Sequence, residues 1–138
     1  LYRRGKAGHP QQFGRLVLVY EDGAGFLSHY HLMDRNVNDP DVVVQETREA
    51  HRKHRGQIES ASFDRGFYNA ENAQLLAEIV EDTCLPPRHP RQYAEAIKSE
   101  CVTFHQLRQR HPGIESAIGA LQSGNGLDRC RDRSEIGF

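Results

Sequence analysis

The chain of 138 residues contains little of what several large classes of protein require. It has no Trp, one Met and three Cys, and the cysteines are widely spaced without a CxxC pair. An odd, scattered set of cysteines argues against a zinc knuckle or a disulfide framework and favours a reducing, cytoplasmic compartment. The GxSxG, HExxH and GxxxxGK[ST] patterns are absent. Triad hydrolases, zincins and P-loop proteins therefore have no support.

Long apolar runs are also missing. The hydrophobic share is 37%, and no window approaches the roughly 20 apolar residues of a membrane helix. We expect no membrane partner and no cleavable signal, since no apolar core follows the basic start. The length predicts one domain. Because the first residue is Leu rather than Met, we expect the chain to start inside a longer protein.

A global basic field is lacking, since the net charge is −1. Positive charge is nevertheless concentrated locally: residues 1–12 are predicted to form a basic arm or linker, and Lys53–Arg55 and Arg88–Arg91 form further basic clusters. Such clusters can follow DNA phosphates, although solvated surface charge explains each of them equally well. The candidate DNA contacts near the start of the chain are Arg3, Arg4, Lys6 and Arg15.

What is present is a regular alternation of strand and helix patterns. Strands are predicted over Phe13–Tyr20, Phe26–Met33, Ile58–Asp64 and Thr83–Leu85. The first of these is an almost continuous apolar run, which is typical of a strand covered on both faces. Helices are predicted between Asp39 and Gly56, over Ala70–Glu81, from Tyr93 to Arg108 and over Ile114–Leu121. This order predicts an α/β fold.

Capping residues predict where the helices begin and end. Asp39 is the expected N-cap of the first helix, with Pro40 at its first helical position and Gly56 as the stop signal. Asn69 is expected to cap the second helix. The expected inner face of the first helix contains Val43, Val44, Thr47, Ala50 and His51.

Two acids stand out because each lies beside a regular element. Asp64 ends a predicted strand, and Glu115 borders the apolar stripe of a predicted helix, with Gly119 leaving space above its carboxylate. Carboxylates of this kind hold Mg²⁺, and two such ions roughly 3.5–4 Å apart can support an in-line displacement at phosphorus. Two simpler interpretations stay open: Asp64 as a turn residue, and Glu115 as an acid favoured by the helix dipole.

Histidine pairs give weaker indications. His29 and His31 share one face of a strand, but no third ligand lies nearby. His51 and His54 are better explained by a solvated helix face.

Four segments in order, RRGKAGHPQQFG, LVLVYEDGAGFLSHYHLMD, SFDRGFYNAEN and HPGIESAIGALQSGNGLDRCRD, resemble the DDE-type transposases of bacterial insertion sequences. The similarity is to the unclassified (ISNCY-like) lineage, which is related to the insertion-sequence-five-like enzymes. It implies an RNase H-like mixed sheet flanked by helices, and metal-dependent cleavage and strand transfer at transposon ends. Asp64 and Glu115 match the second and third acids, which would bind Mg²⁺ or Mn²⁺ in a two-metal site. Arg65 and Gly66 match the tight turn after the second acid.

The chain departs from the family pattern in two ways. His111 and Gln122 stand where related enzymes often carry an Arg and a Lys that contact DNA, which leaves His111 a weak DNA-binding candidate. No acid precedes Glu21, so the first acid and the central strand that bears it are expected to be missing.

From these departures we expect a partial catalytic domain, 1–138, that is marginally folded and inactive alone. DNA and a homodimer partner are family-level expectations. The alternatives are a non-catalytic DNA-binding or dimerisation remnant, and a generic RNase H-like nuclease.

Overall fold

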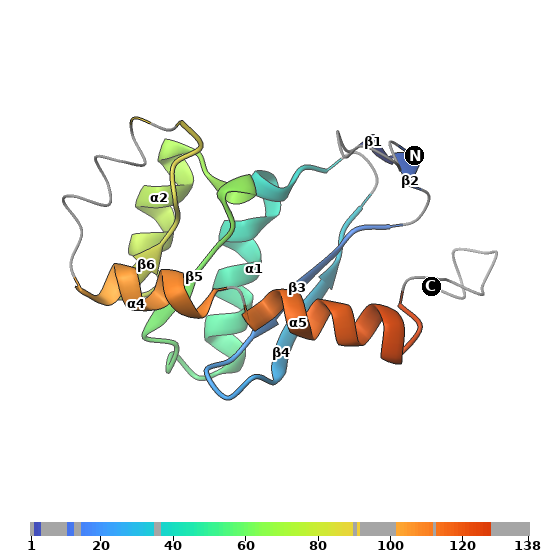
Figure 1. Cartoon of the computed structure of the whole chain (residues 1–138). Coiled ribbons are helices and arrows are strands. Elements are labelled where there is room, and N and C mark those ends of the chain that lie inside the picture. The colour runs from blue at the N-terminus through green and yellow to red at the C-terminus, as the bar shows by residue number, and fades with distance from the viewer. Residues whose placement is uncertain are drawn as a thin grey trace. The chain divides into compact units, whose positions relative to one another are not determined.

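The computed structural model describes residues 2–3, 11–12, 15–34, 37–89, 91, 102–111 and 113–127. The chain forms two compact units: unit 1 consists of Leu1–Arg35 and Ile114–Phe138, and unit 2 consists of Asn36–Gly113. Figure 1 shows their helices and strands. Each unit is described by itself.

Unit 1 contains two antiparallel pairs of strands. The short strands β1 (Tyr2–Arg3) and β2 (Gln11–Gln12) pair with each other. A hairpin is formed by β3 (Val17–Glu21) and β4 (Leu27–Leu32). The helix α5 (Gly113–Gly119) continues into a π-helical segment, η2 (Ala120–Gly124).

The hairpin owes its turn to Asp22 and Gly25. The Oδ1 atom of Asp22 accepts hydrogen bonds from the main-chain N–H groups of Ala24 and Phe26, each at 2.9 Å. Gly25 has a φ of +86°, which L-residues with a side chain rarely adopt. The predicted hairpin with a short glycine-containing loop is therefore confirmed.

The two faces of the hairpin differ in burial. Leu18 pairs with His31 and Tyr20 pairs with His29, so these four side chains share one face. Leu18 and His29 are buried there. On the other face, Val17 and Val19 are only half-buried and Tyr30 is 73% exposed. The prediction that the first strand is covered on both faces is met only in part for the described residues. Val17 and Val19 line an apolar pocket together with Leu121 and Leu127, whereas Tyr30 on the same face is exposed.

Unit 2 begins with α1 (Asp39–Lys53), whose N-cap is Asn38 rather than the predicted Asp39. The Asn38 N–H donates to Asp41 Oδ2 at 3.2 Å, which closes the start of the helix. The helix ends through Arg55 and Gly56, with φ values of +56° and +74°. The Gly56 N–H donates to the His51 carbonyl at 2.8 Å, the six-to-one bond of a Schellman ending.

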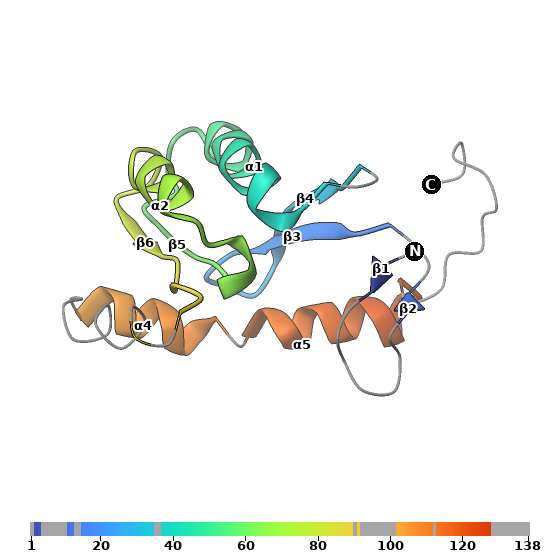
Figure 2. The same ribbon diagram turned by 90° about the horizontal axis from the view of Figure 1, so that it is seen from above.

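The rest of unit 2 is a βαβ segment followed by a helix. The parallel strands β5 (Ser60–Ser62) and β6 (Asp82–Cys84) are connected through the 3₁₀ turn η1 (Arg65–Phe67) and helix α2 (Ala70–Ala77), and α4 spans Val102–Arg110. Figure 2 shows α1 and α2 on one side of this strand pair and α4 on the other. The predicted second helix is shorter than expected, and α4 covers the later part of the predicted helix from Tyr93 to Arg108. Residues 93–101 of that prediction lie outside the described residues.

The core of unit 2 is formed by residues of α1 and of the βαβ segment. Val43 and Ala50 of α1 are buried, as predicted, together with Thr47, whose hydroxyl donates to the Val43 carbonyl at 2.7 Å. They are joined by residues from the βαβ segment, namely Phe63, Leu76, Val80, Cys84 and Leu85. The predicted inward face of α1 is confirmed at these positions.

The architecture is a mixed α/β structure, as predicted at that level. Its described strands form three two-stranded pairs, two antiparallel and one parallel. Among the described helices, none combines the length and apolar character needed to cross a bilayer.

Candidate active site

Asp64 lies at the transition from β5 to η1. Strand β5 ends at Ser62, two residues earlier than the predicted strand, but the Phe63 N–H still donates to the Cys84 carbonyl at 2.8 Å. Phe63 is buried and packs against Phe67, with 6.5 Å between ring centroids. Because Phe63 points into the core, the next side chain, Asp64, turns outward and is exposed.

One oxygen of the Asp64 carboxylate is used by the turn. Oδ1 accepts from the Arg65 N–H at 2.7 Å, and the Asp64 carbonyl accepts from the Phe67 N–H at 3.1 Å. The turn role that the sequence left open is therefore observed. No hydrogen-bond or ion-pair partner is present among the described residues for the second oxygen, Oδ2.

The η1 turn is held from two other elements. Arg88 Nε donates to the Arg65 carbonyl at 3.2 Å, and Arg88 Nη2 donates to the Gly66 carbonyl. Asn72 Nδ2 donates to the Phe67 carbonyl at 3.1 Å and to the Pro40 carbonyl at 2.8 Å. Three successive carbonyls after Asp64 are thus each bound by a side chain.

The turn at Gly66 lies against the start of α1. A Cβ placed at Gly66 would lie 3.4 Å from Asp39 Oδ2, an ordinary van der Waals distance. Arg65 and Gly66 lie within the turn, and their role in shaping it stays a prediction.

His111 contacts the strand that leads to Asp64. Its Nδ1 lies 3.2 Å from the Ser62 hydroxyl, at the end of β5. The contact tethers the end of α4 to the strand two residues before Asp64. The role of His111 as a DNA contact stays a prediction.

Glu115 lies in the first turn of α5 and is exposed. Its carboxylate has no hydrogen-bond or ion-pair partner among the described residues. A Cβ placed at Gly119 would meet nothing within 4 Å, so the surroundings of Gly119 are open. That this space serves the Glu115 carboxylate stays a prediction. The predicted apolar stripe consists of half-buried residues, Ile114, Ala117, Ile118 and Leu121.

The two acids fall in different units, Asp64 in unit 2 and Glu115 in unit 1. Their convergence on one cation stays a prediction. Within the described residues, no group of three or more His, Cys, Asp or Glu side chains is arranged to hold a metal ion. The donor chemistry fits Mg²⁺ or Mn²⁺ in kind, because both candidates are carboxylates with uncommitted oxygens.

The predicted DNA contacts near the start of the chain are only partly described. Arg3 lies in β1, and Arg4 and Lys6 lie outside the described residues. The Arg15 guanidinium, with its side chain 25% exposed, pairs with Asp34 at 3.4 Å and so joins the two ends of the hairpin. Its DNA role is untested.

Strand β5 has an open edge. The Glu59 carbonyl accepts from the Asp82 N–H at 3.0 Å, and the Phe63 N–H donates to Cys84, so residues 59, 61 and 63 direct their backbone groups toward β6. Because the direction alternates along a strand, the N–H and C=O groups of Ser60 and Ser62 point away from β6. They have no backbone partner among the described residues.

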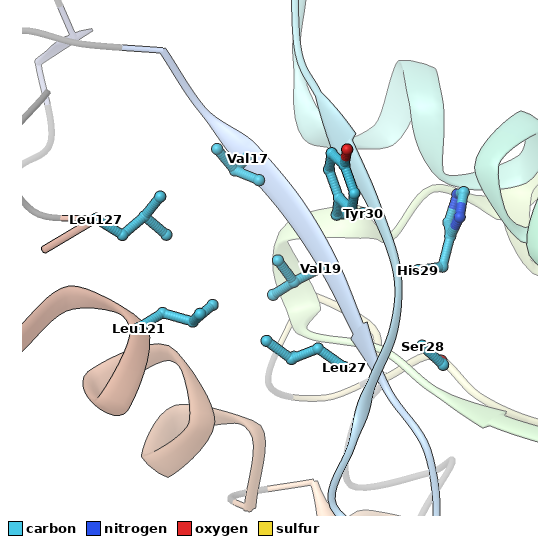
Figure 3. Close-up of a pocket in the computed structure, with 8 residues that line it drawn as sticks. All are labelled: Val17, Val19, Leu27, Ser28, His29, Tyr30, Leu121 and Leu127. Carbon is cyan, nitrogen blue, oxygen red and sulfur yellow. The ribbon is translucent and has the colours of Figure 1, made fainter. Parts of the chain in front are cut away.

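Unit 1 contains an apolar pocket of about 370 Å³. Figure 3 shows Val17, Val19 and Leu27 of the hairpin directed toward Leu121 and Leu127. Its lining is almost wholly apolar and includes neither candidate acid. We interpret it as the incomplete packing of the hairpin against η2 rather than as a reaction site.

The sequence did not reveal the residues that hold the Asp64 turn. Arg88 belonged to a noted basic cluster, but nothing in its spacing pointed to the carbonyls of residues 65 and 66. Asn72 gave no signal, because a polar residue near a helix start is ordinarily exposed.

An exposed acid on an anchored turn at the end of a parallel strand, in a mixed α/β domain, defines a candidate site of the carboxylate, divalent-metal class. The model of the family described as "Transposase DDE domain" matches residues 2–138. The chain therefore belongs to the DDE transposase family, which carries a role in DNA transposition and generally uses divalent metal ions. Searches of curated proteins and of solved structures found no match.

Proposed function

We propose that this chain supplies the second and third acids, Asp64 and Glu115, of a DDE transposase active site of the unclassified, insertion-sequence-five-related lineage. The reaction is phosphodiester cleavage at transposon ends followed by strand transfer into target DNA in the bacterial cytoplasm. Two chains would pair two ends as a homodimer. The observation that carries the proposal is the exposed Asp64 carboxylate, whose Oδ2 has no partner among the described residues, on a turn held by Arg88 and Asn72.

The metal would be Mg²⁺ or Mn²⁺, with two ions in the complete site. Asp64 and Glu115 would hold it, and a divalent cation there supplies charge stabilisation to the phosphoryl oxygens during displacement. The side chains of Ser62 and His111 would contribute by fixing β5, on which Asp64 depends.

The remaining acid of the triad, which is the first in chain order, has to come from outside the described residues. The edge of β5 suits an added strand, because the backbone of Ser60 and Ser62 has no backbone partner among the described residues. A residue on such a strand would lie beside Asp64, because paired strands are about 4.8 Å apart. We propose that the missing strand of the RNase H-like sheet pairs here and carries the first acid, and that the chain alone is inactive.

The test uses Mn²⁺ as a paramagnetic probe of the ¹⁵N-labelled chain. If both acids share a cation, substoichiometric Mn²⁺ will broaden the amide signals of Arg65 and Gly66 together with those of Glu115 and Ser116. Asp64→Asn will remove the broadening at both places, and Glu115→Gln will weaken Mn²⁺ binding at Asp64 by at least about tenfold.

Two matched variants control for the loss of an exposed acid. Asp22→Asn removes a carboxylate that, like Asp64, accepts main-chain N–H bonds in a turn. Glu71→Gln removes a glutamate from the first turn of α2, as Glu115→Gln does in α5. Both controls should leave the broadening unchanged. Broadening confined to one of the two acids would refute the shared cation.

Inactivity is measured separately, by Mg²⁺-dependent nicking of supercoiled DNA. We expect none from the chain alone; nicking that Asp64→Ala abolishes would disprove this part of the proposal. A chain that binds DNA in a gel-shift assay but shows no Mn²⁺ effect at either acid would instead be the non-catalytic, DNA-binding or dimerising remnant.

A further inference from the structure

We infer that Arg88 is a positioning residue for Asp64, which it affects through the backbone of the η1 turn. The inference rests on the proposed function, because it concerns how the second acid is held. Arg88 touches neither the carboxylate nor, in the proposal, the metal. Its contacts are with the two carbonyls that follow Asp64.

The turn needs an external donor. A single 3₁₀ turn ends with carbonyls that have no partner further along the helix. In η1 the only internal bonds of the turn run from the Phe67 and Tyr68 N–H groups to the carbonyls of Asp64 and Arg65. Arg88 supplies the donor that the Gly66 carbonyl lacks and a second donor to the Arg65 carbonyl. It does so with two nitrogens of one planar guanidinium, which fixes the turn more strictly than a single donor could.

The position of Arg88 is itself fixed. It follows β6, which ends at the buried Cys84, through three buried residues, Leu85, Pro86 and Pro87. Two prolines restrict the backbone just before Arg88, so the guanidinium reaches the turn from a rigid base. Asp64 follows β5 and Arg88 follows β6, so the contact joins the segments just beyond the ends of two neighbouring parallel strands.

The arrangement has an electrostatic consequence. The positive charge of Arg88 lies against the carbonyls of residues 65 and 66, which directly follow Asp64 in the chain. When the guanidinium is removed, the Gly66 carbonyl loses its side-chain donor, the Arg65 carbonyl keeps only the Tyr68 N–H, and the turn gains freedom. The Asp64 carboxylate can then adopt more orientations, so the entropic cost of cation binding rises.

The experiment compares Arg88→Gln and Arg88→Lys with a matched control, Arg91→Gln, which removes an exposed positive charge three residues away. Two measurements are made on each ¹⁵N-labelled chain: amide hydrogen exchange, and Mn²⁺ affinity from the broadening at Arg65 and Gly66. Exchange reports on the turn whether or not metal binds.

In Arg88→Gln, exchange at Phe67 and Tyr68 should rise about tenfold, the effect of losing a charge-assisted hydrogen bond of ordinary strength. Exchange at Thr47 and Ala50, in the core of α1, should not change. Mn²⁺ affinity at Asp64 should fall about threefold to tenfold. Arg88→Lys keeps the charge but binds only one carbonyl, so its values should be intermediate. Arg91→Gln should match the natural chain.

The outcomes separate the two proposals. Unchanged exchange at Phe67 and Tyr68 in Arg88→Gln overturns the anchoring role. Faster exchange with unchanged Mn²⁺ affinity overturns the positioning role and leaves the proposed function intact. Equal effects of Arg88→Gln and Arg91→Gln on Mn²⁺ affinity would show a general charge effect and overturn the inference. Absence of Mn²⁺ broadening in the natural chain overturns the proposed function and this role together.

Discussion

The surroundings of the two acids differ sharply. Asp64 begins a turn whose next three carbonyls are bound by Arg88 and Asn72, and the residue before it is buried. Glu115 lies on a seven-residue helix without a buried residue, and its carboxylate has no partner among the described residues. Unit 2 therefore presents its acid from an ordered frame, whereas unit 1 presents its acid from a lightly packed surface. A bound cation would have more ordering to do at Glu115 than at Asp64.

The largest effect should come from the core behind the Asp64 turn. Leu76→Ala truncates a side chain that is 0% exposed and leaves a cavity in the core. Such truncations lower the free energy of unfolding by about 2–5 kcal/mol. Leu121→Ala, at a half-buried position of η2, should cost less than about 1.5 kcal/mol, because less apolar surface leaves contact. Urea unfolding followed by circular dichroism measures both. Equal losses would mean that the packing difference between the units is not real.

An intermediate effect is expected from the second anchor of the turn. Asn72→Ala removes the side-chain donor to the Phe67 and Pro40 carbonyls at a part-buried site, which should cost about 1–3 kcal/mol. Gln74→Ala, at an exposed position of the same helix, is the control and should change stability by less than about 0.5 kcal/mol. If Asn72→Ala unfolds at the same urea concentration as this control, the hydrogen bonds of Asn72 do not hold the turn.

The smallest effect separates two glycines. Gly56 has a φ of +74°, so Gly56→Ala should cost about 1–2 kcal/mol. Gly119 is helical with open space around it, so Gly119→Ala should stabilise the chain by about 0.5–1 kcal/mol. Thermal unfolding of the two variants should shift in opposite directions. A destabilising Gly119→Ala would indicate that the space beside Glu115 is needed by a group outside the described residues.

The sequence predicted the elements well where local chemistry decides them. The hairpin followed from its glycine-containing loop, α2 began after Asn69, and α1 ended at Gly56, because turns and caps depend on nearby residues. The N-cap of α1 was misplaced by one residue because Asn38 and Asp39 are both good caps, and the neighbouring Asp41 decides between them.

The candidate site was predictable only in its residue types. Asp64 and its turn followed from the pattern at the strand end, but Arg88 and Asn72 reach that turn from positions 24 and 8 residues further along the chain. Their contacts depend on how the strands and helices pack, which periodicity does not encode. Burial on the hairpin was misjudged for the same reason: an apolar run fixes a strand but not what covers its second face.

The bare side of β5 has a consequence for handling the protein. Within the part of the chain that the structure describes, the amides and carbonyls of Ser60 and Ser62 have no backbone partner. Such an edge is a template for an extended peptide, including the same segment of another molecule. A peptide bound along this edge would keep the chain monodisperse. Without such a peptide, self-association should increase with protein concentration. Short peptides that alternate polar and apolar residues should therefore act as solubilising additives.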